Sequence, residues 1–356
     1  MANLNIPPEP SRTALVTGGS GFVGGRLIPH LLERGWKVRA LARSPQSEAE
    51  VRALGATPVK GSLAEKSALR DAMAGCEVVF HVAAHFKLWG KQSLFDQANV
   101  EGTRNVVDAA AATASVRRVI AVSAAAVVMG DPEPMIDIDE TLPLQFRAFS
   151  PYSSSKAKGE RLVLGANRVR PDFETIALRP PFVWGAGMPT LEEMVETVHA
   201  GRWQWVDGGR QAMSSCHVDN LCDALVLAAD RGRGGEAYFV ADGEKSTLKG
   251  FISALLATRG VSVSDKAVPF RVAWTMAGLM GAVWRLLRLK GQPPITRQML
   301  RLIGKPFTVR TDKAQADLGY TPRTTMSNGL AAMGGAKSGP AGLTSHRGDR
   351  HAVAAS

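Results

Sequence analysis

Three glycines spaced three residues apart, Gly18, Gly21 and Gly24, stand between a short apolar run and a segment with apolar residues at helical spacing. In a turn that leads directly from a buried strand into a helix, the backbone must come close to neighbouring backbone and to any bound ligand. Glycine permits this because it has no Cβ atom. The following helix presents free N–H groups to an anion at its N-terminus. The stretch Thr17–Gly24 therefore predicts a pyrophosphate-binding loop for a dinucleotide; a plain tight turn is the alternative.

Strand and helix signals alternate through the first half of the chain. Short, nearly all-apolar runs predict buried parallel strands at Thr13–Thr17, Lys37–Ala42, Thr57–Lys60, Glu77–Ala83 and Arg118–Ser123. Helical segments separate them, among them Phe22–Glu33 and Ser93–Ala112. This alternation predicts an α/β fold with a doubly wound parallel (Rossmann) sheet over residues 12–187.

The alternation gives way to mainly helical stretches from Met188 onward. Residues 188–333 are therefore expected to form a smaller, mainly helical, substrate-binding lobe that is interleaved with the first domain. Residues 1–11 contain three prolines and no apolar core of a signal peptide, so we expect a flexible arm. Residues 334–356 are rich in Gly, Ala and Ser, which predicts a disordered tail.

Charge and cysteine content limit the function classes. The formal net charge is +11, and twelve Lys/Arg against three Asp between Arg259 and Arg323 account for +9 of it. This region contains no nucleic-acid-binding motif, so we expect no nucleic-acid partner. Three scattered cysteines, Cys76, Cys216 and Cys222, have no metal-ligand spacing and form no disulfide framework, which is typical of a reducing cytoplasm.

The end of the second predicted strand indicates which dinucleotide the loop binds. An NAD site usually has an acid about 20 residues past the glycines, where it bonds the ribose diol. Ala42 stands there instead, and Arg43 follows it. An arginine can hold a 2′-phosphate by two bonds, whereas an acid would repel it. NADP is therefore the predicted cofactor; NAD stays open, and so does a role for Arg43 as an ordinary solvated side chain.

Tyr152 and Lys156 lie four residues apart at the start of a helical segment, directly after Pro151. Residues at this spacing share one helix face. A phenol has a free pKa of about 10, and a cation one turn away stabilises its deprotonated form. We therefore predict that Tyr152 gives or takes a proton, and that Lys156 lowers the pKa of the phenol and bonds the cofactor ribose.

Taken together, these motifs resemble those of the extended short-chain dehydrogenase/reductase family, within the NAD-dependent epimerase/dehydratase superfamily, over about residues 12–330. The resemblance rests on Thr17–Gly24, His81–Ala84, Asn99–Thr103, Tyr152 with Lys156, Leu178–Gly185 and His217–Asn220. It implies a Rossmann domain in which Tyr152 and Lys156 are catalytic. It also implies cofactor contacts along the loop and the strand ends, at Gly18, Gly21, Phe22, Val23, Gly24, Arg43, Ser62, Leu63, Val82, Ala83, Ala84, Asn99, Lys156, Pro180 and Val183.

One position departs from the family pattern. The family usually has Ser or Thr five residues before the glycine that matches Gly130, and this chain has Ala125 there. In the family, that hydroxyl bonds the substrate oxygen beside the tyrosine, which alanine cannot do. Ser123, two residues earlier on the same strand face, is kept as the third catalytic candidate although it lies about 7 Å away along the strand. Ser153 and Ser154 are alternatives.

The expected substrate pocket is apolar. Sugar-nucleotide members of the family usually have Asn and Tyr at the positions of Phe182 and Met129. With Trp184, Met188 and Trp205, these residues predict a site for a large apolar ligand; ordinary core packing is the alternative.

This pattern is most similar to the 3β-hydroxysteroid dehydrogenase and dihydroflavonol reductase branches. That similarity implies an NAD(P)-dependent oxidoreductase that interconverts a hydroxyl and a ketone on a sterol- or flavonoid-like substrate. Two alternatives stay open: a sugar-nucleotide epimerase or dehydratase, and a catalytically weak NADP-binding protein.

A segment of thirteen uncharged residues, Val272–Trp284, is flanked by Arg271 and by three basic residues up to Lys290. A helix of this kind can lie in a membrane interface, so one expectation is peripheral membrane contact of a cytoplasmic protein through residues 272–290. The other is a lid helix buried against the substrate lobe. The sequence leaves open whether the chain forms a homodimer.

Overall fold

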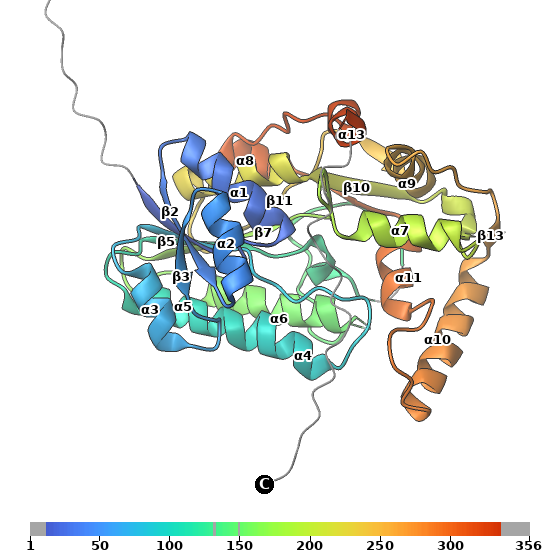
Figure 1. Cartoon of the computed structure of the whole chain (residues 1–356), viewed down its shortest axis with the longest axis horizontal. Helices are drawn as coiled ribbons and strands as arrows, with labels where there is room; N and C mark the ends of the chain where they lie inside the picture. Colours follow the sequence, from blue (N-terminus) through green and yellow to red (C-terminus); the bar gives the residue numbers. More distant parts are fainter. Residues whose placement is uncertain (1–11, 131–132, 149, 336–356) are drawn as a thin grey trace, which may run out of the picture.

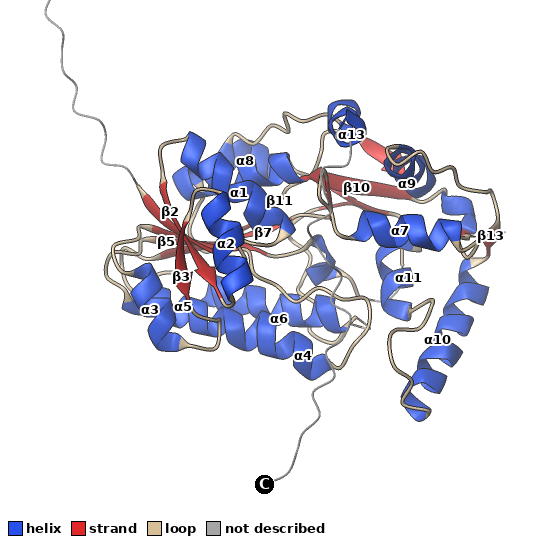
Figure 2. Cartoon of the chain, in the orientation of Figure 1, coloured by secondary structure: helices blue, strands red, loops and turns tan. Residues whose placement is uncertain are grey.

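The computed structural model describes residues 12–130, 133–148 and 150–335. Its largest element is a parallel sheet of seven strands in the order β11-β7-β5-β4-β1-β2-β3 (Figure 2). The strands are β1 (Thr13–Thr17), β2 (Lys37–Ala42), β3 (Thr57–Lys60), β4 (Val78–His81), β5 (Arg118–Val122), β7 (Glu174–Arg179) and β11 (Ala237–Phe239). The predicted doubly wound parallel sheet is confirmed, and β1, β2 and β3 have the predicted bounds.

Helices cover both faces of this sheet (Figure 1). One face has α1 (Phe22–Glu33), α2 (Pro45–Ala53) and α8 (Val218–Arg231), and the other has α3 (Lys66–Met73), α5 (Gly102–Ala112) and α6 (Pro151–Gly165). The strand side chains alternate between two hydrophobic cores. Ala14 and Val16 of β1 pack with α1 and α8, whereas Leu15 packs with α3 and α5.

The chain after β5 alternates between this layer and a smaller lobe, so the two parts are interleaved in sequence. The lobe contains a five-stranded sheet of β12 (Lys245–Thr247), β10 (Ala212–His217), β14 (Phe307–Val309) and β6 (Met135–Ile138), with β8 (Phe182–Trp184) paired to β10. Two further strands, β9 (Trp205–Val206) and β13 (Ala267–Val268), pair with each other. The remaining helices after β8 are α7 (Thr190–His199), α9 (Leu248–Ala257), α10 (Phe270–Leu286), α11 (Arg297–Ile303), α12 (Asp312–Leu318) and α13 (Met326–Gly335).

The lobe contains the predicted helices, but its central sheet was not predicted from the sequence. The strands of this sheet have three to six residues, and Ala212–His217 mixes small, polar and apolar side chains without alternation. The expected arm at residues 1–11 and residues 336–356 of the expected tail lie outside the described ranges, while residues 334 and 335 end α13. None of the helices in the described ranges is long and apolar enough to cross a membrane.

A buried carboxylate ties the lobe to the main layer. Asp242, which follows β11, accepts hydrogen bonds from the Trp184 indole, the Ser215 hydroxyl, the His217 backbone and the Asn220 amide, each at 2.7 Å. These four donors come from β8, β10 and α8. Because one carboxylate satisfies all of them, the orientation of the lobe strands relative to α8 is fixed at a single point.

The predicted helix Ser93–Ala112 is interrupted by a π-helical turn. α4 (Gln92–Asp96) leads into the turn at Gln97–Glu101, and α5 follows it. The turn brings Asn99 against α6, where a Cβ atom on Gly159 would lie 2.3 Å from the Asn99 carbonyl oxygen. Turns of this kind recur at functional sites, and here the close contact requires glycine at position 159.

We expect Gly159→Ala to lower the free energy of unfolding by about 1–3 kcal/mol, because the added methyl group overlaps a backbone oxygen. Gly165→Ala is the matched control, since Gly165 ends the same helix and its Cβ position has nothing within 4 Å. That control should be neutral or stabilise the protein by about 1 kcal/mol or less. Urea unfolding followed by circular dichroism measures both, and equal effects would contradict the packing account.

Candidate active site

The carboxyl ends of β1 and β4 meet where the strand order reverses, which is where open α/β sheets bind their ligands. Gly18 follows β1 with a φ of +74°, and a Cβ atom on it would lie 2.8 Å from the Ala83 backbone, just after β4. A Cβ atom on Gly24 would lie 2.2 Å from the Gly18 carbonyl oxygen. Two of the three predicted glycines are therefore required by the local packing.

The N-terminus of α1 is open to an anion. Gly21 precedes the helix and offers no side chain to the first N–H groups, which begin at Phe22. α2, α6 and α8, in contrast, are capped by the side chains of Ser44, Ser150 and His217. Uncapped amides beside a turn that any Cβ atom would crowd fit the pyrophosphate of a dinucleotide, which these amides would hold.

Residues after β2 and β3 lie at the same edge of the sheet, because the strands are parallel. Arg43 is exposed and makes no hydrogen bond or ion pair with another described residue, so its guanidinium is available to an incoming phosphate. Ser62 donates its hydroxyl hydrogen to Glu65 at 2.7 Å and keeps lone pairs for a donor such as an adenine amino group. The backbone of Leu63 accepts a bond from Asn105. The cofactor contacts of these residues stay predictions.

Tyr152 and Lys156 lie on the first turns of α6, which begins at Pro151. The Lys156 ammonium donates to the Val122 carbonyl oxygen at the end of β5, with a nitrogen–oxygen distance of 2.7 Å. Burial lowers the pKa of Lys156 to about 8, and the carboxylate of Glu160 opposes part of that change. Burial raises the pKa of Tyr152 to about 12. The helix thus presents a protonated phenol and, one turn later, a cation that titrates close to neutral pH.

Phe86 packs edge-on against the ring of Tyr152, with the ring centroids 4.9 Å apart. Phe86 lies in the loop after β4 and is itself 44% exposed. The Tyr152 hydroxyl makes no hydrogen bond with a described residue. The ring is therefore covered on one side, while its hydroxyl is free to engage a reacting oxygen.

A chain of buried hydrogen bonds fixes His81 at the end of β4. The Thr103 hydroxyl donates to the Asn99 carbonyl oxygen, so it accepts its 2.9 Å bond from Nε2 of His81. Nδ1 of His81 then accepts from the Thr17 hydroxyl at 2.8 Å. This neutral form agrees with a His81 pKa of about 3, lowered by burial and, secondarily, by the charge of Lys156. His81 is thus a structural link between β1, β4 and α5.

Asn99 uses its amide to hold the loop after β4. Its Oδ1 atom accepts from the His85 backbone at 2.7 Å, and its Nδ2 atom donates to the His85 carbonyl and to the Ser155 hydroxyl at 3.1 and 3.0 Å. This loop continues directly into Phe86. Asn99 therefore has a positioning role in the structure, and its expected contact with a cofactor stays a prediction.

The hydroxyl of Ser123 donates to the carboxylate of Glu160. Glu160 also pairs with Arg179 through Nε and Nη2, at 3.0 and 2.6 Å, and the two side chains are 0% and 5% exposed. The hydroxyl hydrogen of Ser123 is thus bonded to α6, and the catalytic role of this residue stays a prediction. The Glu160–Arg179 pair was absent from the sequence-based prediction, although Glu160 continues the four-residue spacing of Tyr152 and Lys156.

Ala125 and the two serines considered as its substitutes are buried. Ala125 is 1% exposed, in a 3₁₀ turn whose hydrophobic cluster also contains Tyr152. The Ser154 hydroxyl donates to the Phe146 carbonyl oxygen at 2.6 Å. Ser153 is fully buried, and its hydroxyl has no partner among the described residues. The Ser154 hydroxyl hydrogen is thus bonded to a backbone oxygen, and a substitute role for Ser153 stays a prediction.

The residues predicted to line an apolar pocket lie in two hydrophobic clusters. They are Met129, in the cluster of Tyr152, and Phe182, Trp184, Met188 and Trp205, in the lobe. Trp184 and Trp205 are 0% and 1% exposed, and their indole nitrogens donate to Asp242 and to the Ser264 carbonyl. These two tryptophans are packed as core residues. Phe182 alone among the five is partly exposed, and substrate contact stays a prediction for the set.

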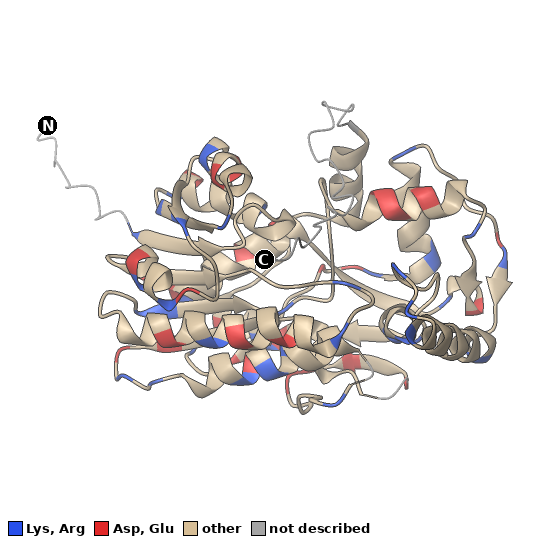
Figure 3. Ribbon diagram, turned by 60° about the horizontal axis from the view of Figure 1, so that its bottom comes forward, with Lys and Arg blue, Asp and Glu red and all other residues tan. Residues whose placement is uncertain are grey.

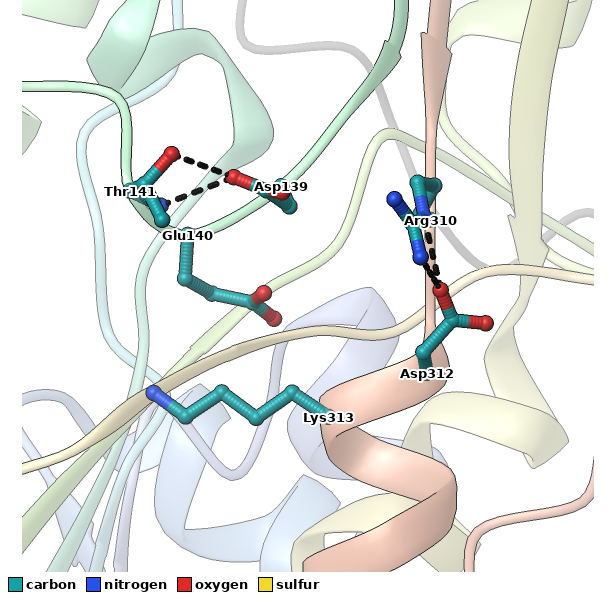
Figure 4. A pocket seen from close by; sticks show the side chains of 6 residues that line it. All are labelled: Asp139, Glu140, Thr141, Arg310, Asp312 and Lys313. Atoms are coloured by element: carbon teal, nitrogen blue, oxygen red, sulfur yellow. Dashed lines mark hydrogen bonds and ion pairs between the residues drawn. The ribbon is translucent and has the colours of Figure 1, made fainter.

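A separate charged hollow of about 400 Å³ lies between the segment after β6 and the start of α12 (Figure 4). Its lining residues are Asp139, Glu140, Thr141, Arg310, Asp312 and Lys313. Asp139 bonds Thr141, and Arg310 pairs with Asp312, as Figure 4 shows. The hollow shares no residue with the glycine loop or the Tyr152–Lys156 pair, so we assign it no substrate.

Within the described ranges, no group of His, Cys, Asp and Glu could hold a metal ion.

Comparison with known proteins adds independent findings. The sequence model of the 3-beta hydroxysteroid dehydrogenase/isomerase family matches residues 15–270. The 4-hydroxy-2-methyl-3-oxo-4-farnesyl-3,4-dihydroquinoline-1-oxide ketoreductase of Stigmatella aurantiaca is 42% identical over 92% of this chain and 96% of its own. The sterol-4-alpha-carboxylate 3-dehydrogenase (decarboxylating) of Dictyostelium discoideum is 30% identical over 90% of this chain and 99% of its own.

A solved structure shares the fold. It is that of a double mutant of dTDP-glucose 4,6-dehydratase from Streptomyces venezuelae with NAD bound, which matches with a TM-score of 0.70. The match covers 90% of this chain and 95% of that chain at 22% identity. At that identity the similarity shows the fold alone.

Proposed function

The chain belongs to the 3-beta hydroxysteroid dehydrogenase/isomerase family, and we propose that it reduces a ketone on a bulky, apolar, ring-containing substrate with NADPH. As a member of this family it is an NAD(P)-dependent oxidoreductase. The observation that carries the proposal is the Tyr152–Lys156 pair, which places an acid and a cation on one helix face beside the end of β5. This arrangement suits proton transfer to a carbonyl oxygen.

Tyr152 is suited to act as the acid. The bound dinucleotide supplies the hydride for the reduction. With a pKa of about 12, the phenol is fully protonated at neutral pH, and it can donate its proton as negative charge develops on the carbonyl oxygen. Phe86 shields one side of the ring from water, which strengthens the electrostatic interactions at the hydroxyl.

Lys156 stabilises the phenolate that proton donation leaves behind. Its pKa of about 8 keeps most of the ammonium charged at pH 7. One of its three N–H donors is bonded to the Val122 carbonyl, so two remain for the phenolate and for a ribose hydroxyl. In the structure burial raises the pKa of Tyr152 to about 12, without a lowering effect of Lys156, so the stabilisation of the phenolate by Lys156 is a proposal that rests on the spacing of the two residues by one helical turn.

The apolar substrate class has two kinds of support. Residues Ala124–Met129, beside Tyr152, are all apolar and buried. The name of the Stigmatella relative describes a farnesyl-bearing dihydroquinoline oxide, and that of the Dictyostelium relative a sterol carboxylate. Both names describe ring systems with large apolar parts. A sugar-nucleotide substrate is not favoured, because its support is a similarity of fold alone.

We expect the purified protein to oxidise NADPH with at least one member of a panel of steroid, flavonoid-like and prenylated quinoline ketones. Tyr152→Phe should lower kcat by about 100-fold or more with little change in NADPH affinity, since it removes the proton donor and keeps the ring. Tyr238→Phe, at a tyrosine bonded to Asp317 away from the site, is the control and should retain kcat. The measurement is the decay of nicotinamide absorbance. A kcat that survives Tyr152→Phe would contradict the mechanism.

The missing hydroxyl at Ala125 gives a second prediction. Ala125→Ser should raise kcat about tenfold or more, because a hydrogen bond to a developing charge is worth about 1.5–3 kcal/mol. Ser123→Ala should leave kcat unchanged and lower the free energy of unfolding by about 1.5–3 kcal/mol, because Glu160 loses a donor. Steady-state kinetics and urea unfolding on the same preparations distinguish an effect on kcat from an effect on stability. Loss of turnover in Ser123→Ala at unchanged stability would restore Ser123 as the catalytic hydroxyl.

Arg43 is the residue we expect to select NADPH over NADH. Arg43→Ala should weaken NADPH binding by roughly 10–100-fold and leave NADH binding unchanged, because it removes the charge that faces a 2′-phosphate. Arg52→Ala, an exposed arginine at the other end of α2, is the control. Calorimetric titration with both cofactors measures the effect. Equal affinity of the wild type for NADPH and NADH would refute the assignment.

A further inference from the structure

After Phe270, which is buried in its first turn, α10 has buried small residues on one face and exposed large apolar residues on the opposite face. Its inner face carries Ala273, Ala277 and Gly281, which pack toward the lobe. Its outer face carries five large apolar side chains that are 43–82% exposed, namely Val272, Met276, Leu279, Val283 and Leu286. At about 100° per residue these five fall within a stripe about 80° wide. A helix at a protein–water surface has the opposite arrangement.

The exposed apolar residues are concentrated in this segment. Seven of the eleven large apolar side chains that are exposed in the described ranges lie within residues 272–289. Leu287 and Leu289 extend the stripe beyond the end of the helix. α10 lies at the outer edge of the lobe, far from the seven-stranded sheet (Figure 1). A contiguous apolar patch of this kind on a protein surface marks an interaction site.

The same segment is strongly basic. Residues 266–311 contain nine Lys/Arg and no Asp or Glu. Arg271, Arg285, Arg288 and Lys290, beside the stripe, are exposed, and none forms an ion pair with a described residue. In Figure 3, acidic and basic positions are interspersed on the helices of the main layer, while α10, seen nearly end-on, is mostly uncharged. The stripe is therefore bordered by cations that the protein itself does not neutralise.

We propose that residues 270–290 dock on an anionic lipid surface, with the apolar stripe among the acyl chains and the flanking cations on the headgroups. Both the exposed apolar area and the unpaired charge are satisfied by this one partner. A second copy of the chain fits less well, because a two-fold interface sets the same surface against itself. Such an interface would bring the unpaired cations of two copies together.

The docking face is joined to the loop after β4. At the start of α11, Thr296 and Gln298 donate to the carbonyl oxygens of residues 88 and 87, at 3.1 and 2.6 Å. Trp89, the next residue of that loop, packs on α10, where a Cβ atom on Gly281 would lie 3.4 Å from its ring. The loop and the docking helix are therefore packed as one unit.

That loop also leads to the site. Phe86, one residue before the tethered carbonyls, covers the ring of Tyr152. An apolar ketone that leaves the bilayer beside α10 would meet this loop before it meets bulk water. This route rests on the proposed function, whereas docking itself does not.

Vesicle sedimentation tests the proposal with the full chain. Wild-type protein should sediment with vesicles of phosphatidylcholine and phosphatidylglycerol, bind vesicles of phosphatidylcholine alone more weakly, and dissociate at high salt. Leu279→Glu combined with Leu286→Glu should weaken binding about tenfold or more. Ile136→Glu combined with Val169→Glu is the matched control, since these side chains are 63% and 62% exposed outside the patch. Circular dichroism confirms the folding of each variant.

Light scattering on the same proteins gives the oligomeric state. A wild type that ignores anionic vesicles, or a Leu279→Glu/Leu286→Glu variant that binds like the control, overturns the proposal. A wild-type dimer that this variant dissociates, without vesicle binding, assigns the face to a second copy and also overturns it. Because sedimentation requires no turnover, a failure here is distinguishable from a failure of the proposed reductase activity.

Discussion

The buried ion pair between Glu160 and Arg179 anchors α6, the helix that carries the proposed catalytic pair. It joins α6 to the end of β7, and the Ser123 hydroxyl joins the same carboxylate to the end of β5. Lys156 precedes Glu160 by one helical turn, and Tyr152 precedes Lys156 by another, so the position of both follows from this anchor. Removing one partner of such a pair costs about 3–5 kcal/mol, because the other charge stays buried and unpaired. The pair thus joins α6 to the sheet through charged hydrogen bonds, in addition to its packing contacts.

The anchor also governs the charge at the site. Burial favours the neutral forms of His81, Tyr152 and Lys156, whose pKa values are about 3, 12 and 8. Glu160 is the negative charge that opposes the lowered pKa of Lys156, and Arg179 takes up part of that negative charge through its two hydrogen bonds. A carboxylate without this arginine would hold Lys156 more firmly in its charged form. The balance leaves a lysine that is cationic at neutral pH and close to its titration range.

The features that were predicted correctly from the sequence are those that depend on residues close together in the chain. The glycine turn and the Tyr152–Lys156 face are set by spacing along one segment, and the structure has both where they were expected. The strands of the lobe sheet are short and pair over long separations, so their sequences contain no periodic signal. The hydrogen bond of Ser123 to Glu160 was not predicted for the same reason, since the two residues lie 37 positions apart on different elements. The burial of Trp184 and Trp205 likewise depends on partners that no local pattern reveals.

The α10 segment shows why composition and structure answer different questions. Thirteen uncharged residues at 272–284 are equally compatible with a buried helix and with an interfacial one, because composition does not state which face is covered. In the structure the lobe buries Ala273, Ala277 and Gly281 together with Phe270, whereas five large apolar side chains on the opposite face stay exposed. Burying the large side chains would have stabilised the fold more, at roughly 25 cal/mol for each Å² of apolar surface. The unused gain on the outer face and the unpaired cations around it are therefore the two observations on which the proposed docking to lipid rests.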